Sequence, residues 1–133
     1  MKKLVLLISM LFLFNSCELD DPSFTVDVLP VASVEMPTEF VLGETYQITM
    51  KYFKPTNCHT SYGIYYEKDL NTRVCAIKNL VENRSNCAPI VNVLVEETFN
   101  FHVTNTGNYI FKFWTGTDDE GNDTFIIHDI PVN

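Results

Sequence analysis

Alternation of apolar and polar residues with a period of two limits the folds that this chain can adopt. The clearest example lies at residues 46–52, where every second residue is apolar: Tyr46, Ile48, Met50 and Tyr52. The same alternation recurs at 98–103 and at 109–113. Successive side chains of a β-strand point to opposite faces, so each segment predicts a strand with one buried side. Helical spacing is scarce, and the pattern indicates an all-β fold.

Five further segments predict strands, at residues 31–36, 61–66, 72–81, 90–95 and 124–132. The stretches between them are rich in Gly, Pro, Asn and Asp, which are typical of turns. Seven or eight short strands separated by turns about every ten residues are typical of an antiparallel sandwich. The sequence therefore predicts a single all-β domain, an antiparallel β-sandwich of seven or eight strands.

The first sixteen residues predict a secretion signal that is removed from the mature protein. Lys2 and Lys3 supply a positive start, and residues 4–14 form an apolar run interrupted only by Ser9. As a helix this run would cover about half of the ~30 Å hydrocarbon core of a bilayer. It is too short for a stable transmembrane anchor.

The apolar run leads into Phe14-Asn15-Ser16-Cys17. This sequence resembles the lipobox of bacterial lipoproteins, in the looser form found in Bacteroidetes-type bacteria. The resemblance implies cleavage before Cys17 and acylation of its thiol with fatty chains such as palmitate. Two or more acyl chains would anchor the protein stably. A plain secretory signal, with Cys17 as an ordinary thiol, is the alternative.

Residues 17–23 then predict a short acidic tether between the lipid and the domain at 24–133. Acidic residues directly behind a lipidated cysteine resemble the surface-export signal of Bacteroidetes lipoproteins. That resemblance implies the outer face of the outer membrane, and a tether facing the periplasm is the alternative. Six residues reach at most about 20 Å, so the domain is expected close to its membrane.

Charge and length limit the partners of the mature chain. Without residues 1–16 it keeps 7 Lys and Arg against 17 Asp and Glu, a formal net charge of −10. The remaining 117 residues are enough for one hydrophobic core and hardly for two. A charge this negative repels phosphate backbones, so nucleic acid is excluded as a partner. The expected partners are a membrane, reached through the lipid, and an unknown protein or glycan.

A second resemblance starts from Tyr109 in the segment Asn105-Thr106-Gly107-Asn108-Tyr109-Ile110-Phe111. This segment resembles the start of strand F in immunoglobulin-like domains, where a tyrosine hydroxyl bonds back to upstream backbone as a tyrosine corner. The resemblance places Phe111, with Ile48 or Met50 opposite, where antibody domains carry their inter-sheet disulfide. It implies an immunoglobulin-like sandwich with an apolar core at that position.

The whole region 24–133 resembles small immunoglobulin-like lipoproteins of Bacteroidetes-type bacteria, most clearly at 39–46 and 111–116. The resemblance covers nearly all of the mature chain. It implies a fold and a membrane location, and it brings no activity with it.

Three cysteines lie beyond Cys17. Disulfides persist outside the cytoplasm, so one pair is expected among them. Cys58 and Cys87 fall in loops, and a hairpin turning near Asp69 would bring both loops to the same end. We therefore predict a Cys58–Cys87 disulfide, with Cys75 as a free thiol buried in the middle of a strand.

Metal sites and cofactors are not expected. The chain has no CxxC pair, and His102 and His128 lie on separate predicted strands, which argues against zinc. Asp118, Asp119 and Asp123 surround Gly121 and form a weak calcium candidate. Their spacing does not match a calcium loop, and a hairpin turn is the preferred interpretation.

No catalytic motif is present, and no catalytic residue is predicted. The sequence contains no GxSxG, phosphate-binding loop or HExxH motif. Glu96 and Glu97 are neighbours on a strand, so they point to opposite faces and cannot act as a pair. We expect that the protein is not an enzyme, and a hydrolase is the least favoured alternative.

Three aromatic residues are candidates for a binding surface: Tyr65, Tyr66 and Trp114. Exposed rings provide a large contact area for a protein or a sugar. The alternative is that they pack in the core or across strands. The sequence thus favours a non-enzymatic, membrane-anchored module with a protein-interaction or adhesion surface. A glycan-binding accessory lipoprotein of an outer-membrane uptake system is the second hypothesis.

Overall fold

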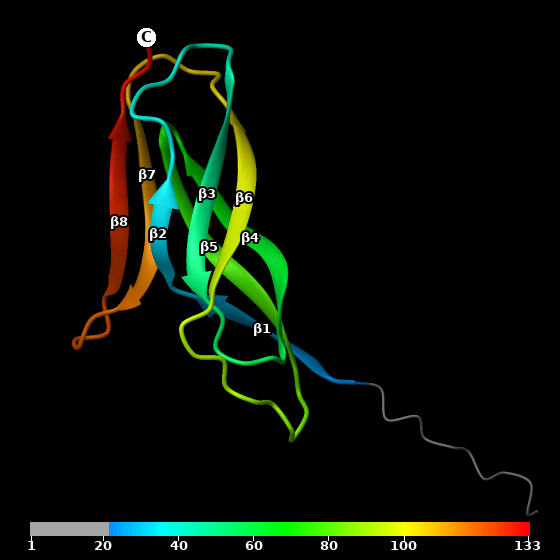
Figure 1. Cartoon of the computed structure of the whole chain (residues 1–133). Helices are drawn as coiled ribbons and strands as arrows, with labels where there is room; N and C mark the ends of the chain where they lie inside the picture. The colour runs from blue at the N-terminus through cyan, green and yellow to red at the C-terminus, as the bar shows by residue number, and fades with distance from the viewer. Residues whose placement is uncertain (1–21) are drawn as a thin grey trace, which may run out of the picture.

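The alternating segments form strands in the computed structural model, which describes residues 22–133 (Figure 1). Cys17, its tether up to Asp21 and the signal segment lie outside the described residues. The strands are β1 (Phe24–Leu29), β2 (Val31–Glu35), β3 (Thr45–Phe53), β4 (His59–Asp69), β5 (Thr72–Glu82), β6 (Leu94–His102), β7 (Tyr109–Thr117) and β8 (Asp123–Ile130). No helix occurs between residues 22 and 133, and the predicted all-β class is confirmed.

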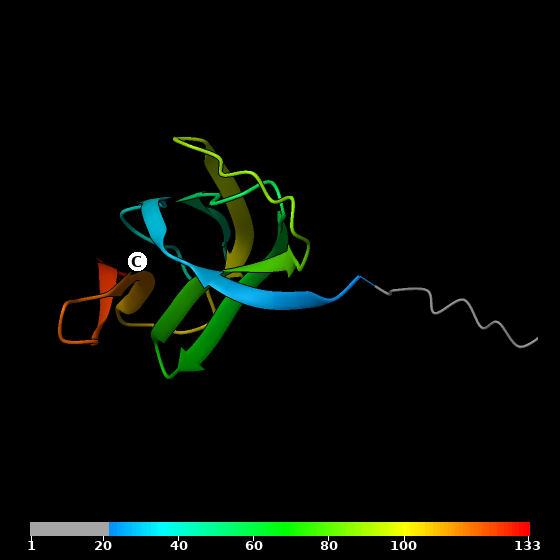
Figure 2. The same cartoon turned by 90° about the horizontal axis from the view of Figure 1, so that it is seen from below.

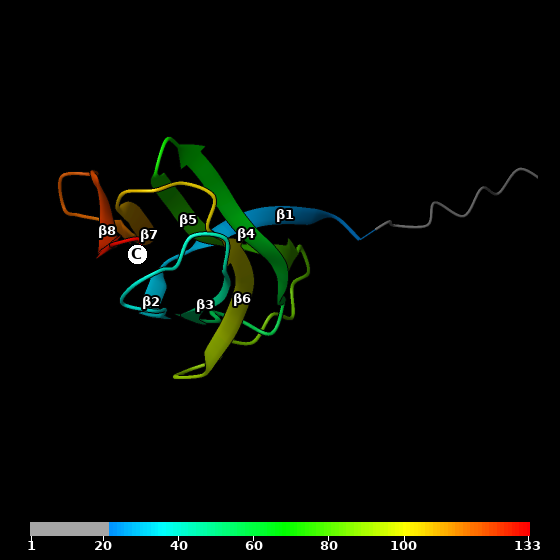
Figure 3. The same cartoon turned by 90° about the horizontal axis from the view of Figure 1, so that it is seen from above.

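The eight strands form a five-stranded and a three-stranded sheet. The three-stranded sheet has the order β2-β3-β6, and the five-stranded sheet contains β1, β4, β5, β7 and β8. Figure 2 and Figure 3, which view the molecule from its two ends, show the sheets as two facing layers. This arrangement is an open β-sandwich.

Strand β5 is the centre of the five-stranded sheet. One of its edges pairs with β4, while β1 and β7 pair with different parts of the other edge. The β5–β7 pairing is parallel and joins Thr72–Cys75 to Ile110–Phe113, whereas every other strand pair between residues 22 and 133 is antiparallel. The sequence did not predict this parallel pair.

Strands β1 and β2 lie in different sheets although only Pro30 separates them. Strand β1 pairs with β5, and β2 pairs with β3. Proline has no N–H to donate to a sheet, so it suits the point where a strand leaves one sheet for the other. Gly116 approaches Pro30 at a bulge in β7, where its φ of 115° favours glycine.

Aromatic rings fill the space between the layers. Phe101 of β6 meets Tyr109 and Phe111 of β7 edge to face, with ring centroids 5.0 Å apart in both pairs. Phe40 covers the same cluster from the connection before β3. Ile48 and Met50, the residues expected opposite Phe111, are also fully buried. The core at this position is apolar, as the sequence predicted.

Tyr109 makes the expected tyrosine corner. Its hydroxyl oxygen accepts the backbone N–H of Asn105 at 3.0 Å and that of Thr104 at 3.4 Å. Burial by itself would raise the pKa of Tyr109, but hydrogen bonds from Thr104 and Asn105 outweigh it and lower the pKa below its ordinary value. The corner ties the connection before β7 to the core.

Two strand predictions need correction. The segment 90–95 is not a separate strand, because only Leu94 and Val95 belong to β6. Asn92 has a φ of 59°, a left-handed conformation that interrupts an extended chain. Strand β1 was not predicted, although Phe24, Val26 and Val28 alternate with polar residues, and these three side chains stay exposed in the structure.

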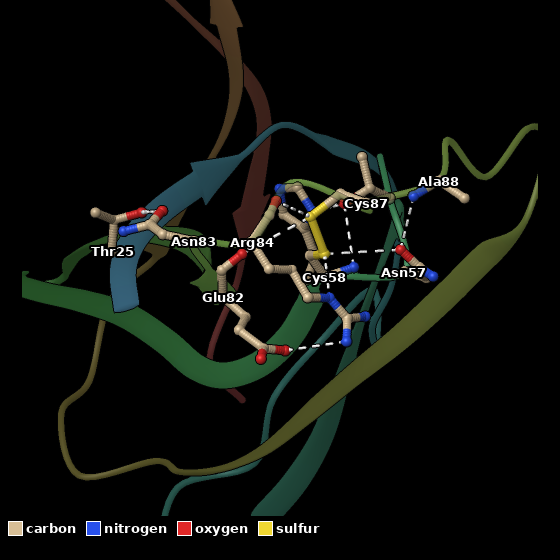
Figure 4. Close-up of a disulfide and its surroundings, with 10 residues drawn as sticks. Thr25, Asn57, Cys58, Glu82, Asn83, Arg84, Cys87 and Ala88 are labelled. Carbon is tan, nitrogen blue, oxygen red and sulfur yellow. Dashed lines mark hydrogen bonds and ion pairs between the residues drawn. A yellow bond between two sulfur atoms is a disulfide. The ribbon is translucent and has the colours of Figure 1, made fainter. Parts of the chain in front are cut away.

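The predicted Cys58–Cys87 disulfide is present (Figure 4). It links the loop before β4 to the loop after β5, with a Cα–Cα distance of 5.6 Å. Asn57 supports the link, because its side-chain oxygen accepts the Ala88 N–H at 2.9 Å. Closing a loop of about 30 residues stabilises a fold by roughly 3 to 4 kcal/mol in the chain-entropy model. Cys75 is free and buried, as predicted.

We expect Tyr109→Phe to lower the free energy of unfolding by about 1 to 2 kcal/mol, because the Asn105 N–H loses its acceptor. Urea denaturation measures this change. The matched control is Tyr62→Phe, which removes a hydroxyl from a half-exposed ring and should stay within about 0.5 kcal/mol of the parent protein. Equal effects of the two substitutions would contradict the role of the corner.

We also expect the free cysteine and the two bonded cysteines of the domain to react with iodoacetamide under different conditions. In the native protein none should react, because burial raises the pKa of Cys75 to about 12 and the other two are bonded. Denaturant alone should release Cys75, and only added reductant should release Cys58 and Cys87. Peptide mass spectrometry reads the labels. Labelling of Cys58 before reduction would show that the disulfide is absent.

Candidate functional site

Two of the three candidate binding aromatics share a hollow on the outer face of the five-stranded sheet. Tyr65 of β4 stands opposite Ala76 of β5, and Trp114 of β7 stands opposite Phe125 of β8. The hollow has a volume of about 290 Å³. Its lining consists of Val28, Tyr65, Glu67, Val74, Ala76, Trp114, Asp123 and Phe125. Residues of five strands line the hollow, and Tyr65 and Trp114 thus lie on one surface.

The rings of Tyr65 and Trp114 each donate a hydrogen bond to a carboxylate. Tyr65 Oη donates to Glu67 Oε2 at 2.5 Å, and Trp114 Nε1 donates to Asp123 Oδ1 at 2.8 Å. The hydrogen bond to Glu67 raises the pKa of Tyr65 above its ordinary value. These bonds restrict the two rings, and the outer faces of the rings stay available for contact.

The outer face extends the apolar surface beyond the hollow. Val26 of β1 is 54% exposed and Ile127 of β8 is 58% exposed. Val26 lies two residues before Val28, and Ile127 two residues after Phe125, so both share the face of the hollow. Exposed apolar patches on a folded domain are typical of interaction surfaces.

Tyr66 is not part of this surface. As the next residue on β4 it points to the inner face, where its ring packs edge to face on Phe99 with centroids 5.9 Å apart. Burial raises the pKa of Tyr66, and the positive charge of Arg73 opposes that rise. Tyr66 lines a separate cleft together with Arg73 and Lys68. The three aromatics therefore divide between the two sides of the sheet.

The acidic segment at 118–123 forms the turn between β7 and β8. Asp118 Oδ1 accepts the backbone N–H groups of Glu120 and Asn122, each at 2.9 Å. Hydrogen bonds from Asn122 and Glu120 lower the pKa of Asp118. Asp123 bonds to Trp114 instead of joining Asp118. Among residues 22–133 no group of three His, Cys, Asp or Glu side chains is placed to hold a metal ion.

Sequence reasoning missed a group of polar contacts among Thr56, His59 and Asp27. Thr56 Oγ1 lies 2.8 Å from His59 Nδ1, and His59 Nε2 lies 3.5 Å from Asp27 Oδ2. Thr56 Oγ1 also accepts the Cys58 N–H at 3.2 Å. The segment 56–59 and strand β1 are far apart in the sequence, so no local motif indicates this contact. These contacts hold the segment next to Cys58 against β1.

Comparison of the chain with family models, with curated proteins and with solved structures gives no match. In the described part of the chain no helix is long and apolar enough to cross a membrane. The resemblance to immunoglobulin-like lipoproteins therefore stays a prediction.

Proposed function

We propose that this protein is a membrane-anchored, non-enzymatic lipoprotein that binds a partner through the outer face of its five-stranded sheet. The observation that carries the proposal is the hollow in which Tyr65 and Trp114 lie together within an exposed apolar surface. Cys17 would supply the anchor, and the rigid sandwich would present the surface. The proposed place is the outer membrane, with the domain facing the cell exterior.

A protein is the favoured partner. Val26, Val28 and Ile127 surround the aromatic hollow with apolar area that a protein surface can cover. Aromatic residues at the centre of such a patch are the usual anchors of an interface. The net negative charge of the chain favours a partner with a neutral or basic surface.

A glycan is the second candidate, and the pairing of rings with carboxylates favours it. Glu67 and Asp123 each retain lone pairs beside a ring, and a sugar offers hydroxyl donors around an apolar ring face. In this case the protein would be the glycan-binding accessory lipoprotein of an outer-membrane uptake system.

The anchor is tested by Cys17→Ser. We expect the parent protein in the membrane fraction with acyl mass on Cys17, and the variant without that mass and released from the membrane. Cell fractionation and intact-mass spectrometry measure both properties. Cys75→Ala removes a different thiol and should leave the protein in the membrane. A Cys17→Ser protein that stays membrane-bound with unchanged mass would refute the anchor.

The binding face is tested by a photo-crosslinking amino acid placed at Val28, on the rim of the hollow. We expect one discrete cross-linked product in intact cells, and we expect Trp114→Ala to abolish it because the central ring is lost. The control Phe53→Ala removes an exposed ring from β3, in the other sheet, and should leave the product unchanged. A product that survives Trp114→Ala would argue against this face.

A glycan array separates the two candidates. Binding to one glycan class that is lost in both Tyr65→Ala and Trp114→Ala would favour the glycan. Phe53→Ala is the control, because its exposed ring lies on β3 in the other sheet. Absence of binding to any glycan, together with a cross-linked protein, would favour the protein partner.

A further inference from the structure

Arg73 is a buried cation without a carboxylate partner. Its side chain is on the inner face of β5, and the residue is only 2% exposed. Two backbone carbonyls, those of Leu70 and Thr72, accept hydrogen bonds from Nη1 at 2.7 and 2.8 Å. Nε is buried and makes no hydrogen bond. Arginine keeps its charge in proteins, so this site retains a cation whose donors are only partly used.

The rings beneath the guanidinium compensate part of its burial. Its central carbon lies 5.1 Å from the ring centroid of Tyr109 and 5.6 Å from that of Phe101. Such cation–π contacts are weaker than the hydration that a buried charge gives up, so the rings do not replace an anion.

A second cation stands directly opposite Arg73. Lys68 of β4 is its cross-strand partner, and the two share the inner face of an antiparallel pair. Like charges in this position repel each other and destabilise a sheet. Within the described range neither residue makes an ion pair with an acidic side chain. In a chain with an excess of acidic residues, this pairing points to an anion that is not part of the protein.

The two cations line a cleft of about 400 Å³ between β4 and β6. The other residues that line it are Ile64, Tyr66, Phe99, Asn100, Phe101, His102 and Thr104. No Asp or Glu belongs to this lining. Rings and an aliphatic side chain form apolar walls, and the hydroxyl and amide groups offer polar contacts near the cations. The cleft therefore has apolar walls and two positive charges. Small-molecule sites likewise combine a mostly apolar lining with a few polar or charged groups.

We propose that this cleft binds a small organic carboxylate whose body carries a ring. The planar guanidinium of Arg73 would meet the carboxylate, with Lys68 as the second positive charge. Tyr66 and Phe99 would flank the ring. The carboxylate can come from an aromatic acid or from a sugar acid, and both present the same chemistry to the cations.

The cleft lies away from the segment by which the chain enters the domain. In Figure 1 the β4–β5 turn lies near the connection between β6 and β7, at the end of the sandwich opposite the point where residues 22–24 enter β1. Asn71 of that turn donates to the carbonyls of Thr106 and Asn108 at 3.0 and 3.2 Å, which holds the two segments together. A ligand would reach the cleft from the end remote from the N-terminal segment.

Calorimetric titration of the purified protein with four probes tests the proposal. The probes are benzoate with its neutral analogue benzamide, and glucuronate with its neutral analogue glucose. We expect saturable binding of benzoate or glucuronate, and binding of the matching neutral probe at least about tenfold weaker. The acid that binds identifies the source of the carboxylate. Absence of saturation by both acids up to about 10 mM would overturn the proposal. Inorganic phosphate is titrated in a separate control, and phosphate that binds as tightly as the better acid would also overturn the proposal.

The variant Arg73→Met tests whether the acid binds in the cleft. We expect this variant to lose at least about tenfold in affinity for the acid. It should unfold at the same temperature as the parent protein or higher, because a buried charge is replaced by an apolar side chain. An arginine with a purely structural role would give the opposite result, a lower unfolding temperature with unchanged affinity.

Lys68→Gln keeps the test decisive if Arg73→Met fails to fold, because Lys68 is exposed. We expect it to weaken binding of the acid about threefold or more. Lys112→Gln makes the same change in charge on β7, whose residue 112 faces away from the cleft, and should bind like the parent protein. Equal affinities of these two variants would overturn the location.

Discussion

The edge-to-face contact of Phe101 with Tyr109 and Phe111 joins the two sheets. It also fixes which residues of the five-stranded sheet point into the sandwich and which point outward. These rings lie on alternate inward positions of β6 and β7. Because strand residues alternate between faces, burying Tyr109 and Phe111 turns Ile110 and Trp114 outward. A shift of one residue in register would bury the outer surface and expose the core.

The same alternation gives the two sides of β4 and β5 different chemistry. Tyr65 faces outward into a hollow where carboxylates hold the edges of aromatic rings. Tyr66, one residue later, faces inward beside Arg73. Tyr65 thus belongs to an apolar surface with carboxylates at its edge, and Tyr66 belongs to a cleft lined by cations. A chain of strongly negative charge can in this way keep one place where an anion is favoured.

Local patterns were enough to predict two features, because each depends on residues that are close in sequence. The alternation at 46–52 predicted β3, and the segment 105–111 predicted the corner at Tyr109. The disulfide followed from a hairpin that places two loops at one end. The strand at 90–95 was wrong, since residue types alone do not reveal the left-handed backbone of Asn92.

By itself, the sequence determined that the chain forms a β-sandwich with an apolar interior. It also favoured the Cys58–Cys87 pair and singled out Tyr65, Tyr66 and Trp114 as candidates for a binding surface. Only the tertiary structure decided that Tyr66 belongs to the other face, and that β5 runs parallel to β7 with Arg73 between the layers. Period-two patterning specifies which residues share a strand face. It carries no information about which strands become neighbours, because that choice depends on packing between residues far apart in the chain.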